Sequence, residues 1–325
     1  MLILNREAVA QALDHAHCVE ALDTVMRSVS TRDVDLPLRR YLEIPGTKGK
    51  FTLMPGYLGD PRSFGVKIVS KFPREPGSRY GSHFGAVMVF DADEGIPLAM
   101  LDGGELTAIR TAAASALATR ELARADASVM AILGSGEQAW HHVAALRGVR
   151  AFDSVRIWSR RQTSGEALAA RIATTLGLPA QTFASARDAI DGADVICTTT
   201  SATDPILPGA WLAPGQHVNL VGAAVRTAAE ADQEVVTRSR YFVDYRPSIM
   251  DQAGELLDAI EAGAVSEEHI VGEIGEVLSG RCAGRLSDEE ITVYKSVGVA
   301  AQDLGAGLAC YQRAREKGIG TEVDW

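Results

Sequence analysis

The sequence lacks the features that would mark a membrane-spanning or secreted protein. Its 325 residues contain no run of about 18 apolar residues, so we expect no transmembrane helix. The amino terminus becomes charged directly after a short apolar start and has no small-residue cleavage site, so we expect no signal peptide. Internal repeats and low-complexity segments are also absent. These absences favour a globular protein of the cytoplasm.

Cysteine is scarce, and its four positions show no pairing or metal-ligand spacing. Cys18, Cys197, Cys282 and Cys310 lie far apart and form no CxxC motif. We therefore expect reduced thiols, as in cytoplasmic proteins of this length, and no bound metal ion.

An excess of basic residues is also missing. The formal net charge is −10, and an acidic surface disfavours non-specific binding to nucleic acid or to an anionic membrane. A small anionic substrate remains compatible with this charge, because a few arginines can gather inside an acidic protein. We therefore expect neither a nucleic-acid partner nor a membrane partner.

What the sequence does contain is enough apolar residues for a full core. The hydrophobic fraction of 46% and the charged fraction of 23% are ordinary for a globular protein, and the length suits two domains. Apolar spacing predicts an amphipathic helix over 6–29, and an alanine-rich stretch predicts a helix over 104–122. Between these helices, turn residues separate short runs that we expect to be strands, at 41–44, 50–54, 65–70, 86–91 and 97–101.

From residue 128 onward, short apolar runs alternate with helical segments. Nearly all-apolar strands that alternate with helices are typical of a parallel sheet covered on both faces. A last helix is expected from about Glu289 through Arg315, long enough to leave this domain and pack on the first one. The first domain is therefore expected to be discontinuous in sequence. We expect strands at 128–133, 154–158, 181–183, 194–200, 217–221 and 241–244, and helices at 137–146, 164–176 and 185–190.

A glycine-rich turn joins the first of these strands to its helix. Gly134 and Gly136 suit a tight turn and a close approach of the backbone to a diphosphate, and Ala139 lets the helix pack on the strand. The helix start then directs free N–H groups at phosphates. This strand–turn–helix context indicates a Rossmann dinucleotide-binding domain, with a purely structural turn as the alternative. We expect the cofactor to contact Gly134, Ser135, Gly136, Glu137 and Gln138.

The end of the second strand bears on which nicotinamide cofactor is used. An acid there would accept hydrogen bonds from the adenosine ribose, whereas Arg and Ser suit a 2′-phosphate. The strand ends at 158–161 without an acid, so we favour NADP(H) bound by Ser159 and Arg160. If the arginines are only solvated, NAD(H) remains possible. The loop after the strand at 194–200 is expected to line the nucleotide with Thr199, Thr200 and Ser201.

Several further motifs follow one another in a fixed order along nearly the whole chain. The most specific are the block at 102–116, which contains Arg110 followed by Thr-Ala-Ala, and the glycine turn at 134–139. Others lie at 54–57, 65–67, 82–83, 192–196, 275–277 and 291–298. Together they resemble the ornithine cyclodeaminase/mu-crystallin family. The resemblance implies an α/β homodimer. It also implies a Rossmann domain at 123–295 and a discontinuous α+β substrate-binding and dimerisation domain at 1–122 with 296–325.

The resemblance also assigns three cations to the substrate site, namely Arg39, Lys67 and Arg110. Chemistry points to the same residues, because a planar Arg grips the carboxylate of an α-imino or α-keto acid bidentately. Hydride transfer is eased when the α-carbon is then held close to the nicotinamide. Lys67 would bind the carboxylate or supply a proton, and Lys67 and Arg110 are the expected catalytic residues. His83 is expected to help bind the substrate, with a buried structural histidine as the alternative.

The sequence departs from the family at two acidic positions. Cyclodeaminases carry an acid two residues after the glycine that corresponds to Gly222, where this chain has Ala224, and a glutamate where it has Thr52. Both carboxylates would be needed to recognise the ornithine amine and activate it for ring closure, so the loss of both disfavours cyclodeamination. Positive residues near the same strands would accommodate a second substrate carboxylate, unless they are only surface charges; they are Arg40, Lys48 and Lys50.

These observations favour an oxidoreductase of amino-acid metabolism that uses NAD(P)H to reduce a small α-imino acid to an L-amino acid. Ketimine reductase, iminosuccinate reductase and alanine-dehydrogenase-like reactions all fit this description. One alternative is an ornithine cyclodeaminase-type ammonia lyase that keeps a bound NAD. The other is a non-enzymatic, mu-crystallin-like protein that only binds a nucleotide or ligand. The sequence leaves open whether the imino acid is linear or cyclic, and mono- or dicarboxylic.

Overall fold

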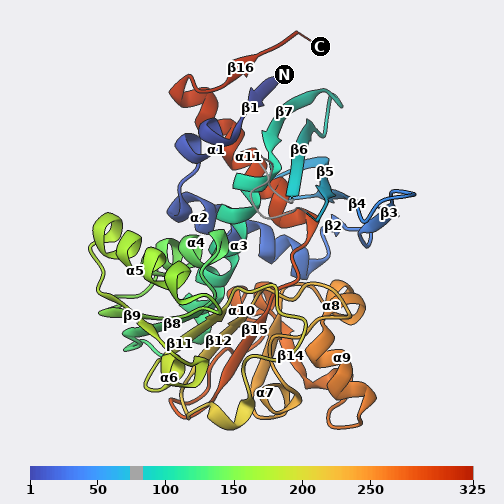
Figure 1. Cartoon of the computed structure of the whole chain (residues 1–325). Coiled ribbons are helices and arrows are strands. Elements are labelled where there is room, and N and C mark those ends of the chain that lie inside the picture. Colours follow the sequence, from blue (N-terminus) through green and yellow to red (C-terminus); the bar gives the residue numbers. More distant parts are fainter. Residues whose placement is uncertain (74–82, 325) are drawn as a thin grey trace. The chain divides into compact units, whose positions relative to one another are not determined.

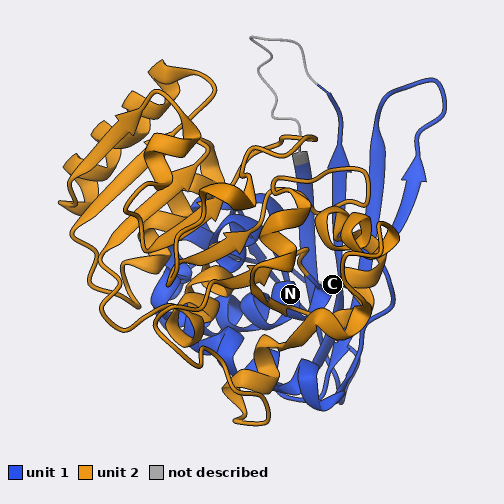
Figure 2. Cartoon of the chain, turned by 90° about the horizontal axis from the view of Figure 1, so that it is seen from below, with its two compact units in different colours: residues 1–111, 299–325 blue, residues 112–298 orange. Residues whose placement is uncertain are grey.

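The structure of the chain is a computed structural model that describes residues 1–73 and 83–324. The chain forms two compact units, which Figure 2 shows in different colours. Unit 1 comprises residues 1–111 and 299–325, and unit 2 comprises residues 112–298. Both chain ends belong to unit 1. The domain limits expected from the sequence, 1–122 with 296–325 and 123–295, stay a prediction.

Unit 1 is built on a mostly antiparallel sheet. Its strands are β1 (Leu2–Leu4), β2 (Val34–Asp35), β3 (Arg40–Glu43), β4 (Lys50–Leu58), β5 (Ser63–Lys71), β6 (His83–Asp91), β7 (Pro97–Asp102) and β16 (Thr321–Glu322). Their order is β16-β1-β7-β6-β5-β4-β2, and β3 pairs with β4. The long central strands β4, β5 and β6 pair without a shift along β5, and Lys67 of β5 lies opposite Met54 of β4 and Val87 of β6. The strands predicted between residues 41 and 101 are therefore confirmed.

The helices of unit 1 pack closely because small residues line the contact. Helix α11 (Ala300–Lys317) contacts strands β4 to β7 and helix α2 (His15–Thr31). A Cβ atom on Gly305 would lie 2.2 Å from Cγ2 of Val25, so glycine permits this approach of α11 to α2. The predicted helix at 6–29 is two helices, α1 (Arg6–Ala12) and α2. They are separate because the side chain of Asp14 accepts a hydrogen bond from the His17 N–H and caps α2.

Unit 2 contains an entirely parallel sheet of eight strands (Figure 1). They are β8 (Val129–Leu133), β9 (Ser154–Trp158), β10 (Ala180–Phe183), β11 (Val195–Thr198), β12 (His217–Leu220), β13 (Arg240–Val243), β14 (Ile270–Glu273) and β15 (Thr292–Lys295). Their order is β10-β9-β8-β11-β12-β15-β13-β14. The order reverses beside β8, which is the Rossmann arrangement of two halves that meet at the first strand. The expected α/β class with a Rossmann unit is confirmed.

Helices connect the parallel strands of unit 2. Helix α3 (Gly103–Leu122) begins in unit 1 and continues into unit 2. The others are α4 (Glu137–Leu146), α5 (Gln162–Leu176), α6 (Ala186–Ile190), α7 (Gln233–Thr237), α8 (Arg246–Gln252), α9 (Gly254–Glu261) and α10 (Ile274–Leu278), with single 3₁₀ turns at Gly209–Trp211 and Glu267–His269. The expected helices at 137–146, 164–176 and 185–190 correspond to α4, α5 and α6.

The last predicted helix is wrong over its first part. Residues 292–295 form strand β15, which is buried along its whole length and pairs with β12 and β13. The run Ile-Thr-Val-Tyr is rich in β-branched and aromatic residues, which favour a buried strand. Gly298 adopts φ +76°, and α11 starts only after Val299. The helix therefore begins at the start of the unit 1 segment.

Candidate active site

The carboxyl ends of the strands in unit 2 form one continuous row. Leu133 of β8 pairs with Trp158 of β9 and Thr198 of β11. Thr198 pairs with Leu220 of β12, which pairs with Lys295 of β15. The residues that follow each strand therefore emerge along the same edge of the sheet. Ligands of open parallel sheets bind at this edge, beside the strand where the order reverses.

The glycine turn begins directly at this edge. Gly134 has φ +132°, and a Cβ atom there would lie 2.6 Å from Oγ1 of Thr199, so only glycine fits between the two strand ends. A Cβ atom on Gly136 would meet no atom within 4 Å. Gly136 caps helix α4 and, as a glycine, offers no side-chain hydrogen bond to the start of that helix. This turn fits the diphosphate of a dinucleotide.

The expected adenosine side of the site consists of hydroxyl groups and an exposed cation. Ser135 Oγ and Ser159 Oγ share a hydrogen bond of 2.7 Å, so the two residues lie together although one follows β8 and the other β9. Arg160 comes next and is exposed. Glu137 is also exposed, while Gln138 is half-buried and its main-chain oxygen accepts a hydrogen bond from Nδ1 of His142.

The loop after β11 lies beside the glycine turn. The N–H of Thr199 donates to the main-chain oxygen of Leu133 at 2.8 Å, and Thr199 is buried. The N–H and Oγ1 of Thr200 both donate to Oε1 of Glu230, at 2.7 and 2.6 Å. Ser201 is exposed. The residues expected from the sequence to bind the cofactor thus follow β8, β9 and β11 at one edge of unit 2, where Glu230 contacts Thr200.

Unit 1 brings Lys67 and Arg110 together on one carboxylate. Nζ of Lys67 and Nε of Arg110 each donate to Oδ1 of Asp303 at 2.9 Å. Nη1 of Arg110 donates to Oε1 of Gln302 at 2.9 Å. Lys67 is 4% exposed, Arg110 is 5% exposed, and both α11 side chains are fully buried. Oδ2 of Asp303 is buried and meets no hydrogen-bond donor in the described part of the chain.

The electrostatics of this cluster favour an ionised carboxylate and a lysine that titrates near neutral pH. The pKa of Lys67 is lowered to about 8, mainly because the side chain is buried. The charge of Asp303 opposes this shift, whereas the charges of Arg110 and Arg39 add to it. Burial alone would raise the pKa of Asp303, but the charges and hydrogen bonds of Arg110 and Lys67 outweigh it and lower that pKa. The lysine therefore lies within reach of proton transfer at physiological pH.

The remaining residues expected near the substrate lie less deep. Arg39 is half-buried just before β3, and its charge reaches Lys67. The side chain of His83 lies outside the described residues. Lys50 forms an ion pair of 3.4 Å with Glu43, and both side chains are exposed. Lys50 therefore behaves as a surface charge in this structure.

The sequence analysis missed Gln302, Asp303 and Glu230. A signal for the first two was present, because they are adjacent polar residues in a stretch, 300–309, that is otherwise made of alanine, glycine and leucine. A buried polar pair in such a helix needs partners, which are supplied here by Arg110 and Lys67. Glu230 has no comparable signal, since it lies in an irregular segment before α7.

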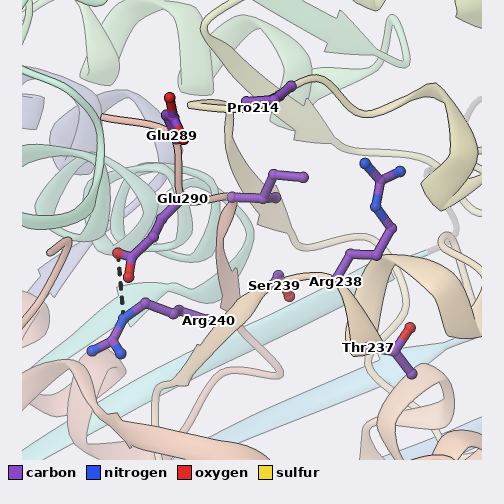
Figure 3. Close-up of a pocket in the computed structure, with 8 residues that line it drawn as sticks. Pro214, Thr237, Arg238, Ser239, Arg240, Glu289 and Glu290 are labelled. Carbon is purple, nitrogen blue, oxygen red and sulfur yellow. Dashed lines mark ion pairs between the residues drawn. The ribbon is translucent and has the colours of Figure 1, made fainter. Parts of the chain in front are cut away.

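A polar hollow of about 450 Å³ lies at the other edge of the sheet in unit 2. Figure 3 shows its residues around the ion pair of Arg240 and Glu290. Arg240 is the first residue of β13, and Glu290 precedes β15, so the hollow opens at the amino ends of the strands. It is therefore separate from the site at the carboxyl ends. Its lining residues are Pro214, Thr237, Arg238, Ser239, Arg240, Glu289, Glu290 and Ile291.

Residues 1–73 and 83–324 contain neither a membrane-spanning helix nor a cluster of metal ligands. None of the helices there is both long and apolar enough to cross a membrane. Within the same residues, no group of three His, Cys, Asp or Glu side chains could hold a metal ion.

Known proteins match this chain over almost its full length. The sequence profile of the ornithine cyclodeaminase/mu-crystallin family matches residues 1–318. A Δ1-pyrroline-2-carboxylate reductase of Bacillus cereus is 32% identical over 326 aligned positions, which cover 100% of both chains.

Solved structures give the same result. The Δ1-pyrroline-2-carboxylate reductase of Thermococcus litoralis, in complex with NADH and L-proline, superposes with a TM-score of 0.95 at 32% identity. The match covers 99% of this chain and 100% of that one. The iminosuccinate reductase of Paracoccus denitrificans, in complex with NAD⁺, gives a TM-score of 0.93 at 29% identity over 100% of this chain and 99% of that one.

Proposed function

The chain belongs to the ornithine cyclodeaminase/mu-crystallin family, and from this premise we propose that it is an NAD(P)H-dependent reductase of a small α-imino acid. The product is an L-amino acid. The relatives named above reduce pyrroline-2-carboxylate and iminosuccinate, which are both α-imino acids. The observation that carries the proposal is the buried cluster of Lys67, Arg110 and Asp303, because it offers both a grip for a carboxylate and a proton.

Arg110 is proposed to bind the substrate carboxylate. Its Nε and Nη1 groups hold Asp303 and Gln302, and its Nη2 group has no hydrogen-bond acceptor in the described residues. The two bonds fix the plane of the guanidinium, so its remaining N–H donors have set directions. Arg39 supplies a further positive charge near Lys67. The three cations make the pocket selective for an anion.

Lys67 is proposed to donate the proton that the reaction needs. Reduction of an imine adds a hydride to the α-carbon and a proton to the nitrogen, and the nicotinamide supplies the hydride when it is bound. Nζ of Lys67 donates one of its three N–H groups to Asp303, so two N–H groups remain for the substrate. The buried and unpaired Oδ2 of Asp303 is an acceptor that a protonated imine nitrogen could satisfy.

Cyclodeamination is the less favoured alternative. The loop at Gly222 carries Ala224 where cyclodeaminases have an acid, and β4 carries Thr52 where they have a glutamate. Neither side chain can accept a proton from a substrate amine or bind it as a cation. A non-enzymatic binding role is also less favoured, because it gives no reason to bury Lys67 with a lowered pKa.

The cofactor is proposed to be NADP(H) rather than NAD(H). Ser159, Ser135 and Arg160 lie at the ends of β8 and β9 without an acid, which suits a 2′-phosphate. The solved relatives named above hold NADH and NAD⁺, so the proposed preference for NADP(H) would distinguish this chain from them.

A homodimer and a cytoplasmic location complete the proposal. Three large apolar side chains are exposed on one face of the sheet in unit 1, namely Leu42 of β3, Leu53 of β4 and Phe84 of β6, with exposures from 36% to 58%. A group of this kind on a sheet is typical of a surface that a second copy covers. All four cysteines are free thiols, which suits a reducing compartment.

The test is turnover of a substrate panel followed by NADPH and NADH absorbance at 340 nm. The panel includes Δ1-pyrroline-2-carboxylate, its six-membered homologue, pyruvate with methylamine, and oxaloacetate with ammonium. We expect consumption of the cofactor with at least one cyclic or linear imine. Absence of turnover with all of them, or formation of proline and ammonia from ornithine, would refute the proposal.

A further inference from the structure

Glu230 is a fully buried carboxylate that ties together two loops of unit 2. Its Oε1 accepts both hydrogen bonds of Thr200, as described above. Its Oε2 accepts from Oγ1 of Thr198 at 2.7 Å, from the N–H of Gly222 at 2.6 Å, and from the N–H of Ala223 at 3.3 Å. One side chain therefore holds the segment after β11 and the segment after β12.

A buried ion pair closes this arrangement into a ring. Nζ of Lys295 donates to the main-chain oxygen of Ala223 at 2.6 Å and lies 2.9 Å from Oε2 of Glu255. Oε1 of Glu255 accepts from the N–H of Glu230 at 3.1 Å. Lys295 is fully buried, and Glu255 is 2% exposed. Ala223 is thus held through its N–H by Glu230 and through its carbonyl by Lys295.

The two loops are also in direct contact. A Cβ atom on Gly222 would lie 2.2 Å from the main-chain oxygen of Thr200 and 2.5 Å from Oε1 of Glu230. Only glycine fits there, so the segment after β12 lies against the segment after β11. This spacing depends on Glu230, because its carboxylate lies between their N–H groups.

The position of the ring in the sheet indicates which half of a dinucleotide it serves. A Rossmann sheet consists of two mononucleotide-binding halves that meet at the first strand. Strands β8, β9 and β10 form the half that starts with the glycine turn. Strands β11, β12 and β15 form the other half, and Glu230 contacts the ends of β11 and β12 while Lys295 ends β15. The second half receives the nicotinamide when the glycine turn binds the diphosphate next to the adenosine.

We propose that Glu230 is a positioning residue for the nicotinamide half of the cofactor. It fixes Thr198–Thr200 and Gly222–Ala223 as the two walls of that half. An ionised carboxylate suits this role because it only accepts hydrogen bonds, whereas an amide would turn one N–H₂ group towards the same donors. The inference rests on the proposed use of a nicotinamide cofactor but does not depend on which imine is reduced.

The test compares whole cofactors with their adenosine halves in the full-length Glu230→Gln variant. Isothermal titration calorimetry measures the Kd of NADPH and NADH, and of the fragments 2′,5′-ADP and ADP, which lack nicotinamide. We expect the Kd of the preferred whole cofactor to rise about tenfold, because at least one charge-assisted acceptor is lost. The Kd of the matching fragment is expected to stay within about twofold of the wild type, since β8 and β9 are untouched.

The matched control is Asp194→Asn, which removes a carboxylate that ties strands together at the opposite edge. Asp194 directly precedes β11. Its Oδ2 accepts hydrogen bonds from the N–H groups of Ser128 and Val129 at the start of β8, both at 2.9 Å. We expect this variant to lose stability while it keeps the wild-type ratio of cofactor to fragment affinity. Glu230→Asp, which retains the charge, is expected to recover part of the lost affinity for the whole cofactor.

The outcomes separate positioning from mere support of the fold. Equal weakening of cofactor and fragment, or no weakening of either, would overturn the role of Glu230. If Glu230→Gln does not fold, Thr198→Val removes only one donor to Glu230 and is expected to weaken the whole cofactor about threefold, with the fragment unaffected. An unchanged ratio in that variant would also overturn it. Wild-type protein that binds neither dinucleotide refutes both proposals, whereas tight binding without imine turnover refutes only the proposed function.

Discussion

The ammonium of Lys67 lies 2.9 Å from a carboxylate oxygen of Asp303, with the lysine 4% and the aspartate 0% exposed. The aspartate comes from α11 and the lysine from β5, so 236 residues of sequence separate them. Because the pair is removed from water, its charges affect each other more strongly than a surface pair would. Because the pKa of Lys67 lies at about 8 and depends on Asp303, its protonation can be followed in the pH dependence of turnover.

The first prediction concerns the pH dependence of turnover. The pKa of Lys67 lies at about 8 instead of its usual 10.5, so the lysine is a proton donor below this pH and loses the proton above it. We expect kcat/KM for a good imine to fall about tenfold for each unit of pH above about 8. Lys67→Arg retains a charge that does not titrate in this range, so the residual kcat/KM of this variant should not fall above pH 8. If kcat/KM of Lys67→Arg falls above pH 8 as it does in the wild type, Lys67 is not the proton donor.

The second prediction concerns Asp303→Asn. The charge of Asp303 and its hydrogen bond raise the pKa of Lys67, so their loss should lower that pKa further and move the basic limb to lower pH. The value of kcat/KM is expected to fall about tenfold or more, because Arg110 also loses its anchor. The measurement is the pH profile of kcat/KM. The control is Asp23→Asn, which removes a partly exposed ion pair with Arg27 on α2 and should leave the profile in place.

The third prediction contrasts the two glycines of the cofactor turn. Gly134→Ala places a Cβ atom 2.6 Å from Thr199 Oγ1 at a backbone φ of +132°, so it should destabilise the free protein by about 1–3 kcal/mol. Gly136→Ala meets no protein atom within 4 Å and should leave the free energy of unfolding within about 0.5 kcal/mol. Both should weaken NADPH binding at least about tenfold. Denaturant unfolding and calorimetric titration measure the two effects, and equal stabilities of the two variants would argue against this geometry.

The fourth prediction concerns cofactor preference. Arg160→Ala removes the exposed cation proposed to meet the 2′-phosphate, so the KM for NADPH should rise about tenfold while the KM for NADH stays nearly constant. Arg187→Ala, which removes another exposed cation of unit 2, serves as the control and should affect neither. A parallel rise of both KM values in Arg160→Ala would show that the arginine does not distinguish the two cofactors.

Local sequence patterns predicted six of the eight strands of unit 2 and missed β14 and β15. Runs such as 129–133 are nearly all apolar and are bounded by turn residues, so both their type and their limits are visible in sequence. Strand β15 was missed because its four buried residues lie only four residues before α11, and periodicity alone does not separate a short buried strand from a helix. Pairing with β12 and β13 decides its conformation, and this pairing is long-range.

The candidate site was predicted only where a residue type carries its own chemistry. Lys67, Arg110 and Gly134 belong to motifs, and the structure places them in contacts that suit those motifs. Asp303 and Glu230 were not predicted, because the hydrogen bonds that single them out are made to residues far away in sequence. For Glu230 these partners are mostly main-chain N–H groups and hydroxyls, which leave no residue signature. A buried acid with such partners becomes visible only in three dimensions.

The way in which the loop at Gly222–Ala223 is held has a consequence for the evolution of new reactions. Glu230 and Lys295 grip this loop through main-chain atoms, so the path of the chain does not depend on the side chain that follows at Ala224. A mutation at that position can therefore introduce or delete an acid while these main-chain contacts stay in place. Lineages that share this backbone could diverge between lyase and reductase chemistry through very few substitutions.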